Sequence, residues 1–391
     1  MRILLVMIEP PLPFGNAAGR WYYVLLRGLV QRGHRVTALA SCTNPDDAVE
    51  AMGLFPSEQY DLRCYPTRSR SSLPEKLQSF LRPMSYLFSA GLRHDLEEKL
   101  AAGYDVLHLE QLFSAALAPR DTSRTLVNVH YLFDIDMRDQ TPPSLKQRVL
   151  QQRICRTENA LLRRMRNITS FTPRLTHRIR EINPLANTFT VPLGIDASLY
   201  AFEPMPQHQR PTLGLIGSFN WGPSFRAAQR LLRDLWPAIK RRVPEARLLI
   251  VGRHAKQMHG AEPGADVIIH ENVPDPLPYF RQLDVMLYAP PVGSGMKVKI
   301  LEAMAIGTPI VTNDEGVEGL PAVDGVHAGI ANDDAGIVER ALALLSDPSR
   351  REQHRVAARK LVETHCSPQA TLDQIERVYE RMGALTGAAA K

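Results

Sequence analysis

The chain has 391 residues, of which 44% are hydrophobic and 23% are charged. This length and composition predict two or three globular domains, and they exclude a single small module and a mainly disordered protein. The formal net charge is +6, and the whole excess lies in residues 1–200, which carry 25 basic and 19 acidic residues. This asymmetry indicates a partner surface in the first half.

The four cysteines are far apart and form no CxxC pair. Their spacing disfavours a disulfide scaffold or a structural zinc site and favours a reducing compartment. The apolar run at the start ends at Glu9, Pro10 and Pro11, which predicts a buried first strand rather than a signal peptide. No apolar run approaches the roughly 18 residues of a transmembrane helix, so a cytoplasmic protein is expected.

Short apolar runs alternate with amphipathic stretches along the chain, which predicts parallel sheets with helical crossovers. The strands expected in the first half are Arg2–Ile8, Arg35–Ala40, Asp105–Leu109, Thr125–Val129, Ile168–Phe171 and Thr188–Val191. The helices expected between them include Ala17–Arg32, Pro74–Ala102 and Ser144–Arg166. The strands expected in the second half are Thr212–Ile216, Ala246–Val251, Val267–Ile269, Asp284–Tyr288, Pro309–Thr312 and His327–Ile330. The helices there are Ser224–Arg242, Val298–Ala305 and Gly336–Ser346.

A domain boundary is predicted after Asp196, because residues 202–211 hold three prolines and little apolar material. The expected division is a first domain over 1–196, a linker over 197–211 and a second domain over 212–368. The predicted fold class is α/β, with two doubly wound, Rossmann-like domains facing a cleft. Ligands bind outside the carboxyl ends of strands in such sheets, so the loops that follow the strands are the candidate sites.

The most informative segment is 284–319. A strand ends at Tyr288, a loop with two glycines follows, and a helix is expected to begin near Met296. The amides of Gly295 and Met296 at a helix start would form an anion site, and Lys297 and Lys299 add positive charge. Glu302, further along the helix, could hydrogen-bond two ribose hydroxyls. The arrangement suits a nucleoside diphosphate.

A plainer interpretation of this segment also stands. The Gly-Ser-Gly run can be an ordinary turn, the two lysines a solvated face and Glu302 an exposed helical residue. The chain has no GxxxxGK[ST] motif, and no GxGxxG follows the first strand, which disfavours a P-loop and a standard dinucleotide-binding site.

Residues 284–319 resemble the donor-sugar site of GT-B glycosyltransferases of family 4, the "group 1" set. The resemblance extends over most of the chain through short motifs in the family's order. These motifs are a glycine-rich first loop at 9–22, a helix-to-strand turn at 29–36, a segment similar to "VPNGVD" at 191–196, a base-binding loop at 273–280 and a closing run at 316–320. Gly217–Trp221 is most similar to a subgroup of bacterial envelope and exopolysaccharide transferases.

The chain departs from the family pattern at three positions. Glu302 matches the second of two family glutamates, but Ser294 stands where the first would be. Ser218 replaces the arginine of the family's "GR....K" motif, and a Pro-Ser pair that ends in Ser224 lies near its lysine position. Lys297 and Lys299 match the basic residues of a "GTRLKILEA" pattern. The phosphate-binding charge is therefore expected at the start of the helix.

Candidate residues in the first domain lie after two strands. His130 ends a strand, and the resemblance implies a hydrogen bond to the transferred sugar or charge stabilisation, whereas a structural histidine is the alternative. Gly15 and Gly19 would allow the first loop to approach a phosphate closely, or would serve an ordinary strand–helix turn. The aspartates Asp134, Asp136 and Asp139 are assigned to a polar loop, because the family resembles metal-independent catalysts; no metal and no cofactor is expected.

Residues 140–180 form a strongly basic stretch with Glu158 as their one acidic residue. Its ten basic residues are Lys146, Arg148, Arg153, Arg156, Arg163, Arg164, Arg166, Arg174, Arg178 and Arg180. Such a stretch would attract anionic lipid or a lipid-linked pyrophosphate, giving peripheral contact with the inner face of a membrane, or it is a solvated helix face. No nucleic-acid-binding motif accompanies it.

The resemblance implies a retaining transferase that moves a hexose-type sugar from a nucleoside-diphosphate sugar, with UDP or GDP, to a hydroxyl acceptor. Lys297, Lys299 and the loop amides would stabilise the diphosphate, Glu302 would hold the ribose, and the Val273 backbone would contact the base. Gly217 and Ser218 are assigned to the same donor site. The acceptor would attack on the leaving-group face, a donor phosphate oxygen would take its proton, and domain closure would exclude water.

The family's last helix crosses back onto the first domain, and the same is expected here of Gln369–Met382, within the C-terminal segment 369–391. Two other functions stay open at this point. One is a two-lobed sugar-binding protein without chemistry, which predicts secretion. The other is a nucleotide-dependent oxidoreductase, which needs a glycine fingerprint that the first loop supplies poorly.

Overall fold

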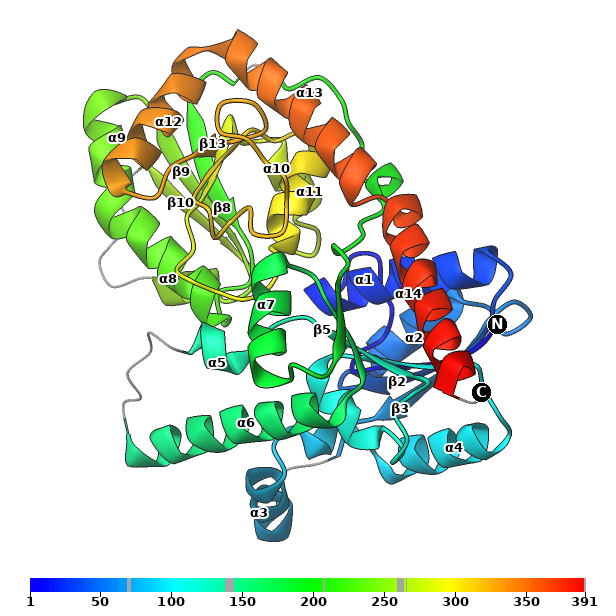
Figure 1. Ribbon diagram of the computed structural model, residues 1–391. Coiled ribbons are helices and arrows are strands. Elements are labelled where there is room, and N and C mark those ends of the chain that lie inside the picture. Colours follow the sequence, from blue (N-terminus) through cyan, green and yellow to red (C-terminus); the bar gives the residue numbers. More distant parts are fainter. Residues whose placement is uncertain (69–71, 138–143, 207, 259–263, 265, 390–391) are drawn as a thin grey trace. The chain divides into compact units, whose positions relative to one another are not determined.

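The computed structural model describes residues 1–68, 72–137, 144–206, 208–258, 264 and 266–389 (Figure 1). Contacts within the chain divide it into two compact units. Unit 1 comprises Met1–Gly194 and Pro368–Lys391, and unit 2 comprises Ile195–Ser367. The predicted linker at 197–211 falls inside unit 2. In the described ranges, no helix has both the length and the apolar character of a membrane span.

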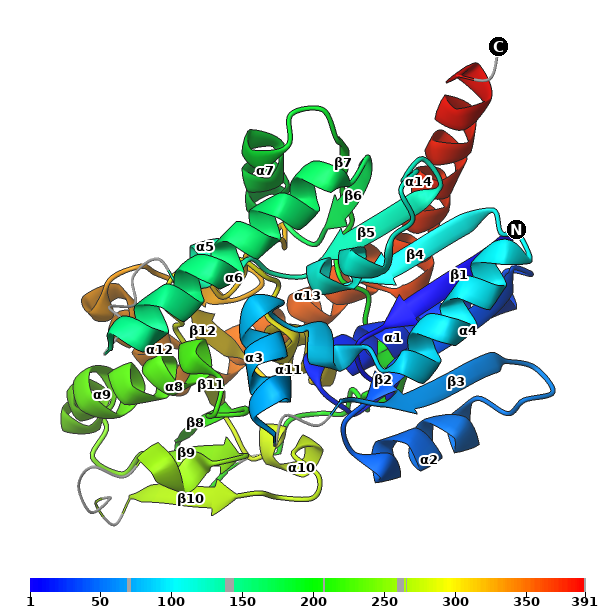
Figure 2. The same cartoon turned by 90° about the horizontal axis from the view of Figure 1, so that it is seen from below.

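Unit 1 is built on a seven-stranded parallel sheet, whose strands appear side by side in Figure 2. The strands are β1 (Arg2–Met7), β2 (Arg35–Cys42), β3 (Asp61–Pro66), β4 (Val106–Glu110), β5 (Thr125–Val129), β6 (Asn167–Ser170) and β7 (Asn187–Thr190). Their order is β3-β2-β1-β4-β5-β6-β7, and every pair is parallel. All residues of β4 and β5 are buried, as expected for strands covered on both faces.

Helices and short turns connect these strands. The α-helices of unit 1 are α1 (Ala17–Gln31), α2 (Pro45–Leu54), α3 (Leu73–Leu81), α4 (Ala90–Ala101), α5 (Phe133–Asp136), α6 (Leu145–Arg164), α7 (Pro173–Ile182) and α14 (Pro368–Ala389). In Figure 1, α14 (red) lies beside α1 (blue), and Arg32 after α1 binds Asp373 and Glu376 of α14 at 2.6 and 2.5 Å. These ion pairs attach the end of the chain to unit 1.

Unit 2 has a six-stranded parallel sheet in the order β10-β9-β8-β11-β12-β13. The strands are β8 (Thr212–Ile216), β9 (Arg247–Gly252), β10 (Val267–Glu271), β11 (Val285–Tyr288), β12 (Ile310–Thr312) and β13 (Gly329–Ile330). The α-helices are α8 (Gly222–Arg230), α9 (Trp236–Arg242), α10 (Leu277–Phe280), α11 (Val298–Ile306), α12 (Asp334–Ser346) and α13 (Pro348–His365). The predicted fold class of two doubly wound α/β domains is therefore confirmed.

Of two long predicted helices, the first is wrong in its continuity, and the second is continuous to Arg242 with a local distortion. The helix expected over Pro74–Ala102 is divided, because Arg82 precedes Pro83 and leaves the helical region, and Met84 then adopts a positive φ of 62°. The helix expected over Ser224–Arg242 starts at Gly222 and contains a π-helical turn over Leu231–Leu235. Strand β3 and helices α2, α5, α7, α10 and α13 were not predicted. The assignment of Asp134 and Asp136 to a polar loop is wrong, because both residues lie in α5. The half-buried β3 lies at the sheet edge and lacks a continuous apolar run.

The strand order reverses once in each sheet, and these two points are where doubly wound folds bind ligands. In unit 1 the reversal lies between β1 and β4, and in unit 2 it lies between β8 and β11. Glu110 is the last residue of β4, and the loops that follow β1, β8 and β11 carry Glu9, Gly217 and Lys297. The topology therefore places one candidate site in each unit.

Candidate functional site

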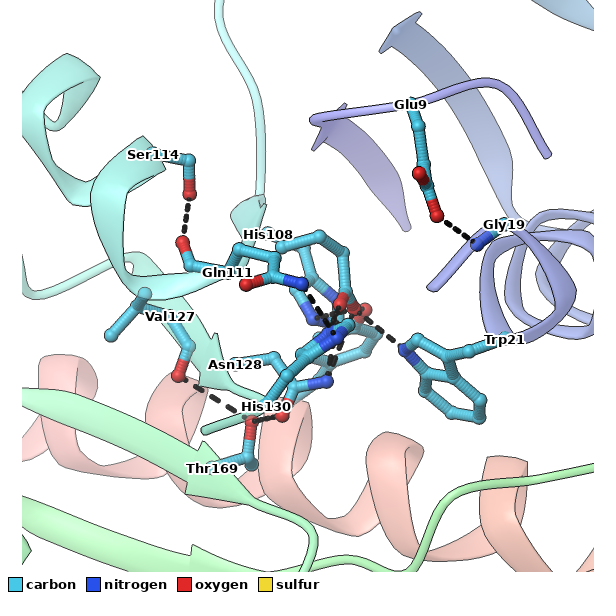
Figure 3. A network of polar contacts seen from close by, with 12 residues as sticks. Glu9, Gly19, Trp21, His108, Gln111, Ser114, Val127, Asn128, His130 and Thr169 are labelled. Carbon is cyan, nitrogen blue, oxygen red and sulfur yellow. Dashed lines mark hydrogen bonds and ion pairs between the residues drawn. The ribbon is translucent and has the colours of Figure 1, made fainter. Parts of the chain in front are cut away.

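A buried carboxylate lies at the carboxyl end of β4 in unit 1. Glu110 is fully buried, and its Oε1 accepts a hydrogen bond from Trp21 Nε1 at 3.0 Å. Asn128 Nδ2, from β5, donates to both carboxylate oxygens at 3.3 and 3.2 Å. Figure 3 shows Trp21, His108, Asn128 and His130 converging on this point. Three elements therefore hold one negative charge inside the unit.

Two histidines flank Glu110. The Nε2 atom of His130 lies 2.5 Å from Glu110 Oε2, and Nε2 of His108 lies 3.0 Å from Oε1. Burial alone would raise the pKa of Glu110, but the two histidines outweigh it and lower that pKa to about 2. Glu110 is therefore ionised at neutral pH. Since a carboxylate only accepts hydrogen bonds, the ring proton of His130 that faces it lies on Nε2.

The second nitrogen of His130 is also engaged. Gln111 Nε2 lies 3.2 Å from His130 Nδ1, and the His130 ring packs against Phe171 with centroids 4.5 Å apart. Gln111 adopts a positive φ of 69°, which is uncommon for a residue with a side chain, and Ser114 Oγ holds its carbonyl at 2.6 Å. A sugar hydroxyl would reach the predicted catalytic His130 only after Gln111 gave up its contact with Nδ1.

A second acidic side chain, Glu9, anchors the first loop. Its carboxylate accepts hydrogen bonds from the amide of Gly19 at 2.7 Å and from Asn16 Nδ2 at 3.1 Å. Burial raises the pKa of Glu9, and these two hydrogen bonds and His130 oppose that rise. A Cβ atom at Gly15 would meet Leu12, and one at Gly19 would meet the Pro10 carbonyl, each at 2.9 Å. The two glycines thus allow the first loop to pack tightly. The amide of Gly19 already donates its hydrogen bond to the Glu9 carboxylate.

Much of the basic stretch contacts its own unit. Arg153 Nε donates to the Phe80 carbonyl, Arg164 Nη2 to the Pro119 carbonyl, Arg178 pairs with Asp134, and Arg180 Nε donates to Thr188 Oγ1. On α6, Leu145 is 76% exposed and Val149 is 40% exposed. Residues 140–143 and Asp139 lie outside the described residues, and Asp136 is buried.

In unit 2, Lys299 reaches from α11 to the start of α8. Its Nζ donates to Ser224 Oγ at 2.6 Å and lies 4.2 Å from the ring centroid of Tyr288, at the end of β11. A Cβ atom at Gly217 would come within 2.8 Å of the same Nζ. A glycine after β8 therefore makes room for the ammonium group, which stands at the carboxyl ends of β8 and β11.

The charge of Lys299 is tuned by its surroundings. Burial lowers the pKa of Lys299 to about 7, Glu302 acts to raise it and Lys297 acts to lower it. Lys299 and Glu302 are three residues apart and so share one face of α11. Glu302 is buried, and Tyr200 Oη donates to its Oε1 at 3.4 Å. The alternative interpretation, in which Glu302 is an exposed helical residue, is therefore wrong.

The loop before α11 differs from the expected helix start. The helix begins at Val298, two residues later than expected, with Lys297 as its N-cap and no side-chain hydrogen bond at the cap. Gly295 and Met296 therefore lie in the loop before the helix rather than at its first turn. Lys297 Nζ donates to the Gly295 carbonyl. Within the loop, the amide of Gly293 donates to Glu315 Oε2 at 3.1 Å. One backbone donor of this loop, the amide of Gly293, is therefore already bound to a carboxylate, that of Glu315.

The remaining predicted donor residues lie in neighbouring loops of unit 2. At Gly252, which ends β9 with a φ of 138°, a Cβ atom would meet the Gly217 carbonyl at 1.8 Å, so these two backbones approach closely. Ser218 Oγ donates to Asn220 Oδ1 at 2.8 Å. Val273 is half-buried in the loop after β10. The loops after β8, β9, β10 and β11 share the carboxyl edge of one sheet.

Sequence reasoning missed several polar residues of these sites. Glu110, His108, Gln111 and Glu9 were given no role, although His108 and Glu110 stand in an otherwise apolar strand, a pattern that signals buried polar groups. Ser224 was noted only as a departure, and its contact with Lys299 spans 75 positions of the chain. No local pattern reports such a contact.

Comparisons with known proteins agree with this geometry. A family model described as "Glycosyltransferase Family 4" matches residues 18–199, and one described as "Glycosyl transferases group 1" matches residues 210–347. Together the two matches cover most of the chain. No curated protein matches the chain by sequence comparison.

Solved structures with the same fold are distant in sequence. Sucrose-phosphate synthase from Thermosynechococcus elongatus is 15% identical, with a TM-score of 0.71 over 98% of this chain and 100% of its own. Anabaena HepE in complex with UDP and glucose is 15% identical, with a TM-score of 0.67 over 97% and 100% of the two chains. A variant of S. aureus TarM in complex with fondaparinux, alpha-GlcNAc-glycerol and UDP is 9% identical, with a TM-score of 0.66 over 97% and 100%. With two doubly wound units and both family models in chain order, the chain belongs to the group 1 glycosyltransferases of family 4, with the GT-B fold.

Proposed function

We propose that the protein is a retaining hexosyltransferase that moves a sugar from a nucleoside-diphosphate sugar to a hydroxyl acceptor in polysaccharide, glycolipid or other glycoconjugate biosynthesis. Membership of a glycosyltransferase family favours this over a non-catalytic sugar-binding protein or an oxidoreductase. The observation that carries the proposal is the Lys299 ammonium, held between Ser224 and Tyr288 at the carboxyl edge of the unit 2 sheet.

The donor diphosphate is assigned to this edge of unit 2. Lys299 and Lys297 supply positive charge, and the amides near Gly295 and Met296 supply backbone donors. Fixed charges and dipoles of this kind stabilise a diphosphate leaving group without a metal ion. Arriving phosphate oxygens would compete with Glu315 for the amide of Gly293, because both are anionic acceptors. Donor binding is therefore expected to release that carboxylate.

The nucleoside is assigned to the residues on either side of the diphosphate. Glu302 is buried one helical turn from Lys299. Its carboxylate would accept hydrogen bonds from the ribose hydroxyls, and the Val273 backbone would contact the base. Gly217 and Ser218 line the same site. The bases of first choice for a test are uracil and guanine, and the solved complexes of HepE and TarM contain UDP.

The transferred sugar and the acceptor are assigned to unit 1. His130, held by the ionised Glu110, carries a proton on Nε2 and would present Nδ1 to a sugar hydroxyl once Gln111 moves. In the proposed retaining reaction the acceptor oxygen attacks the anomeric carbon on the leaving-group face. The bond to the diphosphate breaks, and a donor phosphate oxygen takes the acceptor proton.

Peripheral membrane contact is a second proposal, limited to the start of α6. Leu145 and Val149 are exposed there beside Lys146 and Arg148, and apolar groups between basic ones suit an anionic lipid surface. Each basic residue near such a surface contributes about 1 kcal/mol. Flotation with anionic and neutral vesicles tests this contact, and equal binding to both would contradict it.

The donor assignment is tested by thermal unfolding with a panel of nucleoside diphosphates and activated sugars. A ligand at 100 times its Kd stabilises by about 2.7 kcal/mol, which for a unit of this size raises Tm by about 5–10 °C. We expect this rise with UDP or GDP for the parent, and its loss in Lys297→Ala. Lys360→Ala, an exposed lysine on α13, is the matched control and should respond as the parent does.

Two outcomes would overturn the assignment. One is that no activated sugar of the panel releases a nucleoside diphosphate, and the other is that Lys297→Ala responds to nucleotides like the parent. The stereochemistry is settled separately by NMR of the product, because a product with inverted anomeric configuration would exclude the retaining reaction.

A further inference from the structure

A tyrosine near the end of the chain completes the polar cluster around Glu110. The Tyr379 hydroxyl, on α14, lies 2.6 Å from His108 Nδ1, and the two rings meet edge to face with their centroids 5.8 Å apart. The two residues are 271 positions apart in the chain, and both are fully buried. Through His108, α14 is therefore connected to the carboxylate that holds His130.

The direction of this hydrogen bond follows from the burial of the phenol. Burial and then the charges of Glu110 and Glu376 raise the pKa of Tyr379 well above its usual value, so the hydroxyl keeps its proton. Among the residues that the structure describes, His108 Nδ1 is the hydrogen-bond partner of that hydroxyl. The hydroxyl therefore donates, and Nδ1 accepts with a lone pair.

The ring proton of a neutral His108 then lies on Nε2, which faces Glu110. This nitrogen lies 3.0 Å from Glu110 Oε1 without the alignment of a full hydrogen bond, so the contact acts through charge. A proton on Nε2 attracts the carboxylate, whereas a lone pair there would repel it. The Tyr379 hydroxyl thus selects the form of His108 that stabilises Glu110 as an anion.

The other contacts of the cluster have the same polarity. Thr169 Oγ1 donates to Asn128 Oδ1 at 3.2 Å, which turns the amide hydrogens of Asn128 toward Glu110 (Figure 3). On the far side of the carboxylate, His130 Nε2 faces Glu110 Oε2 at 2.5 Å, and Gln111 Nε2 lies 3.2 Å from His130 Nδ1. In this arrangement His130 carries its proton on Nε2 and an acceptor at Nδ1.

We propose that Tyr379 and His108 are positioning residues of the transfer reaction, which keep His130 in the form that accepts a hydrogen bond at Nδ1. The inference rests on the proposed function, because it concerns the histidine assigned to the transferred sugar. Both residues act through Glu110, which lies between the rings of His108 and His130. Without the phenol, His108 Nδ1 would be a buried acceptor without a donor, and a second ring proton there would be stabilised by Glu110. That cation would draw the carboxylate charge away from His130.

Nitrogen-15 NMR of the histidine side chains tests the proton arrangement without a substrate, and His108→Gln identifies the His108 signals. In the parent at neutral pH, we expect His108 to carry one proton, on Nε2. In Tyr379→Phe, we expect it to carry two, and the Nε2 proton of His130 to move upfield as its hydrogen bond weakens. Tyr65→Phe is the matched control, because it removes another hydroxyl of unit 1 that binds a carboxylate, that of Asp95 at 2.5 Å. Its histidine signals should match those of the parent.

Release of the nucleoside diphosphate from the activated sugar that the parent uses fastest tests the effect on the reaction. Tyr379→Phe should lower kcat about tenfold and change the KM for the donor by less than about twofold, because the donor is assigned to unit 2. In a His108→Gln background, Tyr379→Phe should lower kcat by less than about twofold, because an amide has no second protonation state to adopt. Tyr65→Phe should have the kcat of the parent.

Three results would overturn the inference and leave the transferase function standing. They are a parent in which His108 carries a proton on Nδ1, a parent-like kcat in Tyr379→Phe, and an equal loss of kcat from Tyr379→Phe in the His108→Gln background. A parent that releases no nucleoside diphosphate from any activated sugar gives a different result, because it overturns the transferase proposal and this inference together.

Discussion

Replacing Glu110 by glutamine is the sharpest perturbation of the unit 1 site. The substitution keeps the size of the side chain but replaces one acceptor oxygen by an amide that donates. Trp21 and Asn128 both donate to the carboxylate, and His130 faces it with a proton. The new amide hydrogens would therefore point at existing donors. We expect β4 and β5 to lose stability without a change of overall fold.

The size of the effect follows from the structure by two routes. The pKa of Glu110 falls from 4.5 to about 2, and at about 1.4 kcal/mol per unit this corresponds to about 3 kcal/mol in favour of the ionised form. Alternatively, the loss of one or two hydrogen bonds to a buried charge costs about 1.5–3 kcal/mol each. Because the folded pKa is depressed, this stability is present above about pH 4.5 and is lost as the pH falls toward 2.

Hydrogen exchange measured by mass spectrometry reports on each unit separately. At neutral pH, peptides that cover β4 and β5 should exchange about a hundredfold faster in Glu110→Gln, whereas peptides that cover β11 in unit 2 should be unchanged. Glu97→Gln, an exposed residue of α4, is the matched control. The difference from the parent should narrow below about pH 4.5. Exchange of β4 within about twofold of the parent would refute the role given to this carboxylate.

Three further predictions concern single contacts. Burial lowers the pKa of Lys299 to about 7, so the affinity for UDP or GDP should fall as the pH rises above about 7. Measured by calorimetry, the affinity of Lys299→Met should not depend on pH in this way. An affinity of the parent that does not change with pH would contradict the prediction. Gly217→Ala should weaken nucleotide binding about tenfold, because its Cβ would stand 2.8 Å from Lys299 Nζ, whereas at Gly222 the nearest atom is 3.5 Å away and alanine should bind normally. Tyr379→Phe removes the hydroxyl that lies 2.6 Å from His108 Nδ1, and should lower exchange protection of β4 by about 1–2 kcal/mol; unchanged protection would exclude this contact from the stability of unit 1.

The sequence alone determined the fold class and most of the elements. Continuous apolar runs such as Leu248–Val251 predicted strands buried on both faces, and the strands at Thr125–Val129 and Thr212–Ile216 have the predicted bounds. These features are local in the sequence. Each unit of the pattern, an apolar run followed by a glycine and an amphipathic stretch, lies within a short segment of the chain. The order of such local motifs along the chain was enough to indicate the family.

Only the tertiary structure decided which polar groups meet. Glu110 joins side chains from α1, β4 and β5, and Lys299 meets Ser224 from a different helix. The predicted helix is divided at Arg82, and the Tyr86 carbonyl then accepts a hydrogen bond from the amide of Arg68, which follows β3. A parallel sheet collects the carboxyl ends of strands that are far apart in the chain. Contacts made there depend on strand order, and strand order leaves no periodic trace in the sequence.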